Sequence, residues 1–538
     1  MLKTVLLTSL VLLVPIIGAR TLGWFESSEL ATYDNFIERR PKETPDDRVV
    51  VVTISDEDIE ELQQFPIHDG TLATALAKLE SYQPWAIGLD IARDVPQGPP
   101  AGRKQLADVI GKSQVIVSGC LLSTENHPGS PPAPGTPEGG AAFADFPTDV
   151  DKSVRRARLI SVPGKPNKKP RTNHTCNDAS PDNEIPSLSF QLALMYLAGS
   201  NINPDAAARN EVQFGKQILH KIDPQFGGYR HAEVNDYQMM LNYRGSHQVF
   251  KEISLLDVLK NKVRPDQIRD RVVLIGYTSE VSKDSLSTPY RETQSGSRLM
   301  YGVVVHAHAV SQILSAVLDQ RPLIRSWSDL SEMAWIVGWA LGGGILAFYS
   351  RRLGLFLLVV VGSSSALIGL CYWLFVYQGL WIPLSPALTA LLLTAFGVRL
   401  LDLATRSGYA QAIYDQLRDQ WQRGGNDRDR RGDYLESLVL RARATRQGQA
   451  AAELASQGGQ LDPTASPEMK ALYEQITARV KQDMVAEQSA QMAAMTRRGG
   501  NKANRMQALL NRAQRSRSET PAKPASRVAG NSPEVPHE

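Results

Sequence analysis

Four polar side chains near the expected ends of buried strands are the residues best suited to chemistry. Asp56, Asp90 and Asp284 each end or closely follow a run of apolar, β-branched residues, and His306 lies in the stretch YGVVVHAHAVSQIL. In open α/β sheets, ligands bind beyond the carboxyl ends of the strands. We therefore predict that these four residues line a ligand-binding pocket. Aspartate is also favoured at helix starts and in loops, so simple capping is the alternative.

His306 and His308 stand two positions apart, which in a continuous strand would direct both rings to one face, where they could hold a metal. The apolar spacing predicts a strand over Val303 to Val305 and a helix from about Ala307, so the chain turns between them. We therefore predict no metal site and no catalytic residue. His306 is expected to be hydrogen-bonded at this turn, near Asp284.

The apolar runs that carry these residues predict an α/β domain with a mostly parallel, buried sheet. Unbroken β-branched runs are typical of strands covered on both faces. Such runs span residues 48–54, 85–91, 113–119 and 271–277. Helical spacing predicts helices at 69–83, with Asp69 as N-cap, and at 187–198 and 253–261.

Four charge-poor segments are long enough to cross a bilayer. They occupy residues 2–19, 333–350, 353–376 and 381–398. Trp327, Trp335, Trp373 and Trp381 near their ends resemble interfacial anchors. We predict an uncleaved membrane anchor at 1–20, with a cleaved signal peptide as the alternative, and three transmembrane helices within 331–402.

The positive-inside rule orients these segments. Arg351 and Arg352 separate two spans, and Arg399 follows the last one. We expect a multi-pass inner-membrane protein with both termini in the cytoplasm and an extracytoplasmic domain at 21–330. Cys120 and Cys176 both fall in that domain, where a disulfide can persist. The sequence leaves a bridge and two free thiols equally open.

The chain of 538 residues carries 59 Lys and Arg against 56 Asp and Glu, a balance that gives no case for nucleic acid binding. The segment 403–538 is predicted to be a cytoplasmic tail. Amphipathic spacing favours helices at 409–422 and 466–495, and composition favours disorder from about residue 515. It carries no kinase or phosphate-loop motif. Its basic character suits anionic lipid or an acidic partner.

Several motifs in a fixed order resemble the second class of CHASE domain, a sensory domain associated with cyclases and histidine kinases. They are VVVVTISDEDIEELQQFPIHDGTLATALAKLESYQPWAIGLDIARD, DVDKSVRRARLI, LNYRG, ISLLDVLKNKVRPDQIRDRVVLIGYTSEVSKDSLSTPY and MYGVVVHAHAVSQIL. The resemblance covers roughly residues 25–400 and implies an α/β extracytoplasmic sensor followed by three spans.

The resemblance places individual residues as well. Asp90, Asp284 and His306 fall in its motifs, as do Asp151 and Arg155. The stretch FPIHD departs from the family pattern, because an aspartate stands where an arginine is usual. The family ligand is not implied by the motifs.

We therefore predict a membrane sensor without catalytic output of its own and without a cofactor. Its expected partners are the lipid bilayer, an unidentified extracytoplasmic ligand and a cytoplasmic protein bound by 403–538, with a homodimer also expected. The first alternative is an assembly scaffold with a degenerate sensor domain. A less favoured alternative is a metal-dependent hydrolase that would use His306, His308 and the aspartates.

Overall fold

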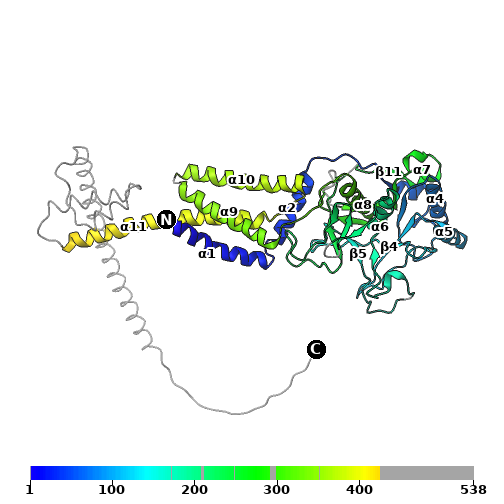
Figure 1. Cartoon of the computed structure of the whole chain (residues 1–538), viewed down its shortest axis with the longest axis horizontal. Coiled ribbons are helices and arrows are strands. Elements are labelled where there is room, and N and C mark those ends of the chain that lie inside the picture. Colours follow the sequence, from blue (N-terminus) through cyan, green and yellow to red (C-terminus); the bar gives the residue numbers. More distant parts are fainter. Residues whose placement is uncertain are drawn as a thin grey trace, which may run out of the picture. The chain divides into compact units, whose positions relative to one another are not determined.

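The computed structural model describes residues 2–423 except 171, 208–210, 247–248, 291–298 and 351 (Figure 1). Its helices are α1 Leu2–Thr21, α2 Glu26–Arg39, α3 Asp56–Leu62, α4 Asp69–Ser81, α5 Pro100–Lys112, α6 Leu188–Gly199, α7 Leu255–Leu259, α8 Gly302–Leu318, α9 Asp329–Tyr349, α10 Leu353–Gln378 and α11 Ser385–Arg423. Its strands are β1 Val49–Ile54, β2 Ala86–Asp90, β3 Ile116–Cys120, β4 Ala141–Phe143, β5 Arg156–Ser161, β6 Ile185–Pro186, β7 Asp205–Ala206, β8 Val212–Phe214, β9 Gln217–Leu219, β10 Tyr237–Met240, β11 Lys251–Ser254, β12 Val272–Tyr277, β13 Ser285–Ser287 and β14 Leu299–Tyr301.

A six-stranded parallel sheet, in the order β11-β1-β12-β2-β3-β4, forms the centre of the domain. The four predicted strands are its β1, β2, β3 and β12, so the predicted fold class is confirmed. Ile253, which the sequence analysis assigned to a helix, belongs to the edge strand β11, and α7 starts at Leu255. Smaller antiparallel sheets follow the orders β10-β5-β6, β7-β8-β9 and β13-β14.

Helices cover both faces of the parallel sheet (Figure 1). Alternate residues of β1 face opposite sides, as the period of a strand requires. Val49 and Val51 join the core under α6 and α8, whereas Val50 and Val52 join the core under α4, α5 and α7. This double burial explains why the strands carry unbroken β-branched runs.

Close contact between α8 and the sheet depends on Gly276 of β12. A Cβ atom at this position would lie 2.6 Å from Cβ of Val303, so only glycine leaves room for the first turn of the helix. Fourteen of the 17 residues of α8 are buried. The sheet therefore fixes the start of α8 at the carboxyl end of the central strands.

The start of α4 differs from the predicted one. His68 occupies the N-cap position without a side-chain hydrogen bond, and Asp69 is the first helical residue. The Asp69 side chain is buried, where its carboxylate accepts a hydrogen bond from the backbone of Gln97 at 3.2 Å and lies 3.4 Å from Arg103. Pairing with these groups replaces the capping role that the sequence suggested.

Arg155 joins α2 to β5 through a buried ion network. Its guanidinium donates to Asp34 at 2.7 and 2.9 Å, to Asp149 at 2.8 Å and to Asp151 at 2.6 Å. Arg155 and Asp34 are each 1% exposed. A charge buried this deeply requires paired and hydrogen-bonded partners, which these carboxylates provide.

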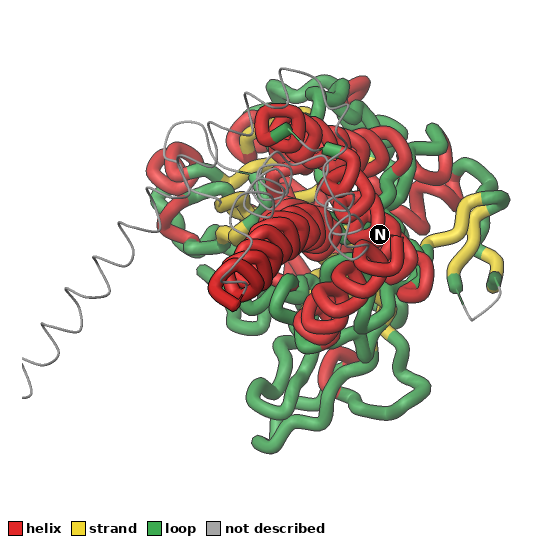
Figure 2. Tube along the Cα trace, turned by 90° about the vertical axis from the view of Figure 1, so that its left-hand side faces the viewer, coloured by secondary structure: helices red, strands yellow, loops and turns green. Residues whose placement is uncertain are grey.

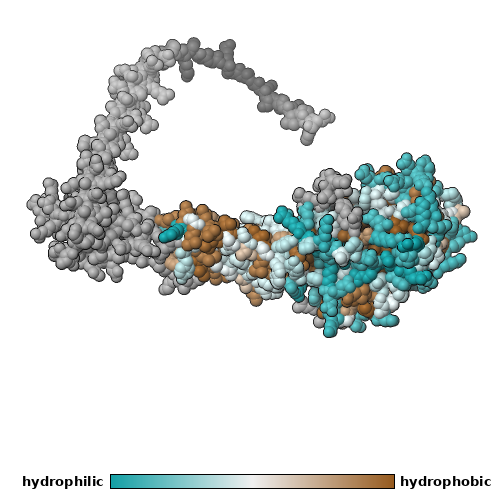
Figure 3. Space-filling model, turned by 90° about the horizontal axis from the view of Figure 1, so that it is seen from above, coloured by the Kyte–Doolittle hydropathy of each residue, from teal (hydrophilic) through white to brown (hydrophobic). Residues whose placement is uncertain are grey.

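Three helices are long and apolar enough to cross a membrane, namely Asp329–Tyr349, Leu353–Gln378 and the first part of α11, Ser385–Ala404. The first apolar segment passes the same test only jointly with α2, and that pair is bent by 78°. These helices lie side by side (Figure 2), and their surface is markedly more apolar than that of the α/β domain (Figure 3). The spans of a membrane protein are thus present.

Trp381, between α10 and α11, lies inside protein rather than at a lipid interface. Its ring is 1% exposed and packs against Tyr33 at 5.2 Å and Tyr229 at 5.7 Å between ring centroids. Gly227 completes the slot, since a Cβ there would lie 2.6 Å from the indole. The interpretation of Trp381 as an interfacial anchor was wrong, because a tryptophan beside a span can equally dock into an adjoining domain.

Two backbone hydrogen bonds and a buried ion-pair group also join the spans to the α/β domain. The Arg325 backbone N–H donates to Gly379 O at 2.8 Å, and the Trp381 N–H donates to Arg325 O at 2.8 Å. Arg20 at the end of α1 pairs with the buried Glu332 at the start of α9, and Arg230 of the domain lies 3.5 Å from the same carboxylate. The membrane helices and the domain therefore share a polar junction.

The predicted tail helix at 409–422 is part of α11. The predicted helix at 466–495 and the disorder predicted from about residue 515 lie outside the described residues.

Candidate functional site

Asp90, Asp284 and His306 meet at the carboxyl end of the parallel sheet. Asp90 is the last residue of β2, Asp284 precedes β13, and His306 lies on the second turn of α8. The His306 Nε2 atom lies 3.8 Å from Asp90 Oδ1. The backbone N–H of Gly302, which begins α8, donates to Asp284 O at 3.1 Å. We refer to these three side chains as the acid–histidine cluster.

Both nitrogens of the His306 ring have hydrogen-bond partners. Nε2 lies 3.2 Å from Ala144 O and Nδ1 lies 2.7 Å from the Ser189 hydroxyl. A carbonyl oxygen only accepts, so Nε2 carries the proton and Nδ1 accepts from Ser189. Burial lowers the pKa of His306 to about 4, although the Ala144 bond and the nearby carboxylates oppose this shift. The imidazole is therefore neutral at physiological pH.

The two carboxyl groups of the cluster have raised pKa values. Burial raises the pKa of Asp90 to about 7. Burial and, secondarily, the charge of Asp90 raise the pKa of Asp284 to about 6. Two partly buried carboxyl groups that repel each other and lie near a neutral imidazole therefore titrate closer to neutral pH than ordinary aspartates.

Asp145, which follows β4, is a further carboxyl group near the acid–histidine cluster. Its carboxylate accepts from the Leu122 backbone at 3.1 Å and lies 3.7 Å from Arg158, which also lies 3.6 Å from Asp236. Burial raises the pKa of Asp145, while Arg158 acts in the opposite direction. Arg158 is thus shared between two carboxylates outside the acid–histidine cluster.

Asp56 makes a different set of contacts. Its carboxylate accepts hydrogen bonds from the Ser279 hydroxyl and from the Glu280 backbone at 3.2 Å. The Ser279 bond lowers the pKa of Asp56. These contacts fasten the turn after β12 to the end of β1, which positions the segment leading to Asp284.

His308 faces away from His306, because α8 already begins at Gly302. The predicted strand at Val303 to Val305 was therefore wrong. Two residues apart on an α-helix differ by about 200° in direction. His308 Nδ1 accepts from the Arg244 backbone at 3.3 Å, and its ring packs against Phe250 at 4.8 Å. The two histidines belong to separate sites.

The potential metal ligands do not converge. Within the part of the chain that is described, no group of three or more His, Cys, Asp or Glu side chains is arranged to hold a metal ion. Cys120 and Cys176 are joined by a disulfide with their Cα atoms 6.5 Å apart, so neither thiol is available.

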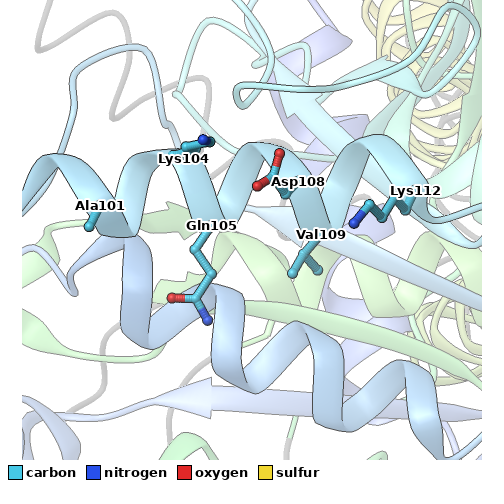
Figure 4. Close-up of a pocket in the computed structure, with 6 residues that line it drawn as sticks. All are labelled: Ala101, Lys104, Gln105, Asp108, Val109 and Lys112. Carbon is cyan, nitrogen blue, oxygen red and sulfur yellow. The ribbon is translucent and has the colours of Figure 1, made fainter.

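A surface hollow of about 320 Å³ lies along the flank of α5 (Figure 4). Its lining residues all come from that one helix and alternate in charge, namely Ala101, Lys104, Gln105, Asp108, Val109 and Lys112. The side chains point in different directions along the helix, so they do not converge on one ligand position.

Sequence reasoning missed Ser189, Ala144 and Asp145. Ser189 is read from the sequence only as part of an apolar helix, and Ala144 acts through its backbone carbonyl, so neither carries a recognisable signal. Asp145 follows a three-residue strand too short to be recognised by its pattern.

The fold defines a class of protein in which a mixed α/β domain is joined to candidate membrane-spanning helices. The CHASE2 domain matches residues 9–345, which is more than half of the chain, so the chain belongs to the CHASE2 domain family. It is a membrane protein with a CHASE2 sensor domain, and no catalytic domain is identified in it. Searches of curated proteins and of solved structures gave no match.

Proposed function

We propose that this protein detects an extracytoplasmic cue at the acid–histidine cluster and relays it through its spans to a separate cytoplasmic partner. In this proposal the chain has no catalytic output of its own, both termini lie in the cytoplasm, and the segment 403–538 binds the partner. The positions of Arg351 and Arg352 between two spans, and of Arg399 in the last turns of the final span, support this orientation.

The observation that carries the proposal is the path from the cluster to the membrane helices. Helix α8 begins at the cluster, passes through the domain core and ends at Leu318. The segment that follows pairs through Arg325 with the turn that carries Trp381, then enters α9 at Asp329. A displacement of α8 therefore has a continuous packed route to α9 and to the α10–α11 turn.

If the spans relay a signal, the positions of their ends remote from the α/β domain should differ between the two signalling states. The test uses the full chain in lipid nanodiscs with nitroxides at Tyr349→Cys and Leu400→Cys, both exposed positions, in a Cys371→Ser background. Double electron–electron resonance measures the distance between the two labels. Asp90→Asn perturbs the cluster, and Asp266→Asn, at an exposed surface carboxylate, is the matched control.

We expect Asp90→Asn to shift this distance and Asp266→Asn to leave it unchanged. The shift should shrink when Trp381→Leu is added, because the route through the junction is then weakened. An unchanged distance in Asp90→Asn would contradict the relay and favour an assembly scaffold instead.

A further inference from the structure

The inference that follows rests on the proposed function and names its cue. We propose that the cue is the proton: Asp90 and Asp284 together bind one proton at neutral pH, and its loss changes the position of α8. The site is thus a sensor of extracytoplasmic acidity rather than a pocket for an organic ligand.

The first step is the charge of the site. The charged and titratable groups around it come from five elements: Asp90 of β2, Asp284 before β13, His306 of α8, Asp145 after β4 and Arg158 of β5. Among the described residues, neither Asp90 nor Asp284 has a Lys or Arg within ion-pair distance. Full ionisation would leave two negative charges without a cation from the described residues.

The two described neighbours that could carry a positive charge, Arg158 and His306, do not neutralise the carboxylates. Arg158 is already divided between Asp145 and Asp236. His306 has both nitrogens engaged, by Ser189 and by Ala144, and is 2% exposed. A second proton on Nδ1 would reverse the hydrogen bond with Ser189, and burial of the ring disfavours its charged form. Carboxyl groups in this situation favour the protonated form, and the charge of Asp90 raises the pKa of Asp284 further.

The second step couples the proton to α8. Asp284 accepts the first N–H of this helix through its backbone, and its side chain lies beside the same turn, since a Cβ at Gly302 would be 3.1 Å from Asp284 Oδ1. The N-terminus of a helix attracts negative charge. Loss of the shared proton therefore increases the attraction between Asp284 and the start of α8 while Asp90 repels Asp284.

The experiment measures protonation and conformation separately on the full chain in nanodiscs. The infrared carbonyl band of a protonated carboxylic acid, taken as the difference between wild type and Asp90→Asn, reports the proton. The distance between labels at Tyr349 and Leu400 reports the spans. Both are followed from about pH 5 to about pH 9, a range that leaves ordinary surface carboxylates ionised.

We expect both signals to change with a common midpoint near pH 7. Asp284→Asn should move the infrared midpoint of the remaining Asp90 to lower pH, because it removes a like charge. Asp266→Asn should leave both signals as in the wild type.

Two results would overturn the proton as cue. If the infrared band does not titrate in this range, the pair holds no shared proton, even where Asp90→Asn still shifts the distance and the relay stands. If the band titrates but the distance stays constant with pH, the pair binds a proton but its binding does not change the conformation of the spans. If neither Asp90→Asn nor pH moves the distance, the relay itself fails.

Discussion

Gly227 provides a direct measure of how firmly the spans are fastened to the domain. Replacement by alanine has two costs. Its φ of +56° is a left-handed conformation, in which a non-glycine residue costs about 1 kcal/mol or slightly more. The new Cβ would also lie 2.6 Å from Trp381, and such overpacking costs about 1–3 kcal/mol. Gly227→Ala should therefore destabilise the protein by about 2–4 kcal/mol.

Gly215 separates these two costs. Its φ is +57°, and a Cβ there would meet no atom within 4 Å, so Gly215→Ala carries only the backbone cost. Both substitutions are to be made in the wild type and in Trp381→Leu, with unfolding followed by denaturant titration of the full chain in detergent. In the Trp381→Leu background, Gly227→Ala should cost only about as much as Gly215→Ala, which leaves a coupling of about 1–3 kcal/mol. An equal cost of Gly227→Ala in both backgrounds would refute the docking of Trp381 against this turn.

Three other substitutions test the domain itself. Because burial raises the pKa of Asp90 to about 7, the folded state binds its proton more tightly than the unfolded state, so the free energy of unfolding falls as pH rises from about 4 to about 7. Asp90→Asn should remove this loss, which is at most about 4 kcal/mol of unfolding free energy. It should therefore raise the melting temperature relative to wild type more at pH 8 than at pH 5, and an equal effect at both pH values would contradict the raised pKa. Arg155→Met should cost about 3–5 kcal/mol in denaturant titration, since it removes the buried guanidinium that pairs with Asp34, Asp149 and Asp151 together, and a cost below about 1 kcal/mol would show the network to be dispensable. Cys176→Ser should lower stability by about 4 kcal/mol, because the bond to Cys120 closes a loop of 56 residues, and full reduction of the wild type should give the same melting temperature as the variant.

The central strands were predictable because local and tertiary preferences agree in them. A strand covered on both faces needs β-branched residues throughout, and β1 and β12 have them. β5 was not predicted, since Arg156 and Arg158 interrupt its apolar pattern, and the carboxylates that pair with them lie outside the strand. The same rule that found β1 misassigned Val303 to Val305, where burial of α8 on several sides removes the helical periodicity.

The candidate site was predictable only in part, for a related reason. The expectation that ligands bind beyond the carboxyl ends of strands indicated Asp90, Asp284 and His306, which the fold brings together. It also pointed to Asp56, whose contacts are with Ser279 and Glu280. Which carboxylate turns inward is decided by packing between segments far apart in the chain, and a strand pattern carries no information about that.

The paired backbone hydrogen bonds between Arg325 and the turn before α11 restrict the freedom of the membrane helices. They hold the start of α9 and the start of α11 at a fixed separation, so neither helix can slide along its axis as an independent piston. The motion that remains is a pivot about this fixed point. In a helix about 30 Å long, a pivot of about 5° carries the remote end sideways by about 2.5 Å, which is enough to change the side chains it presents to a neighbour.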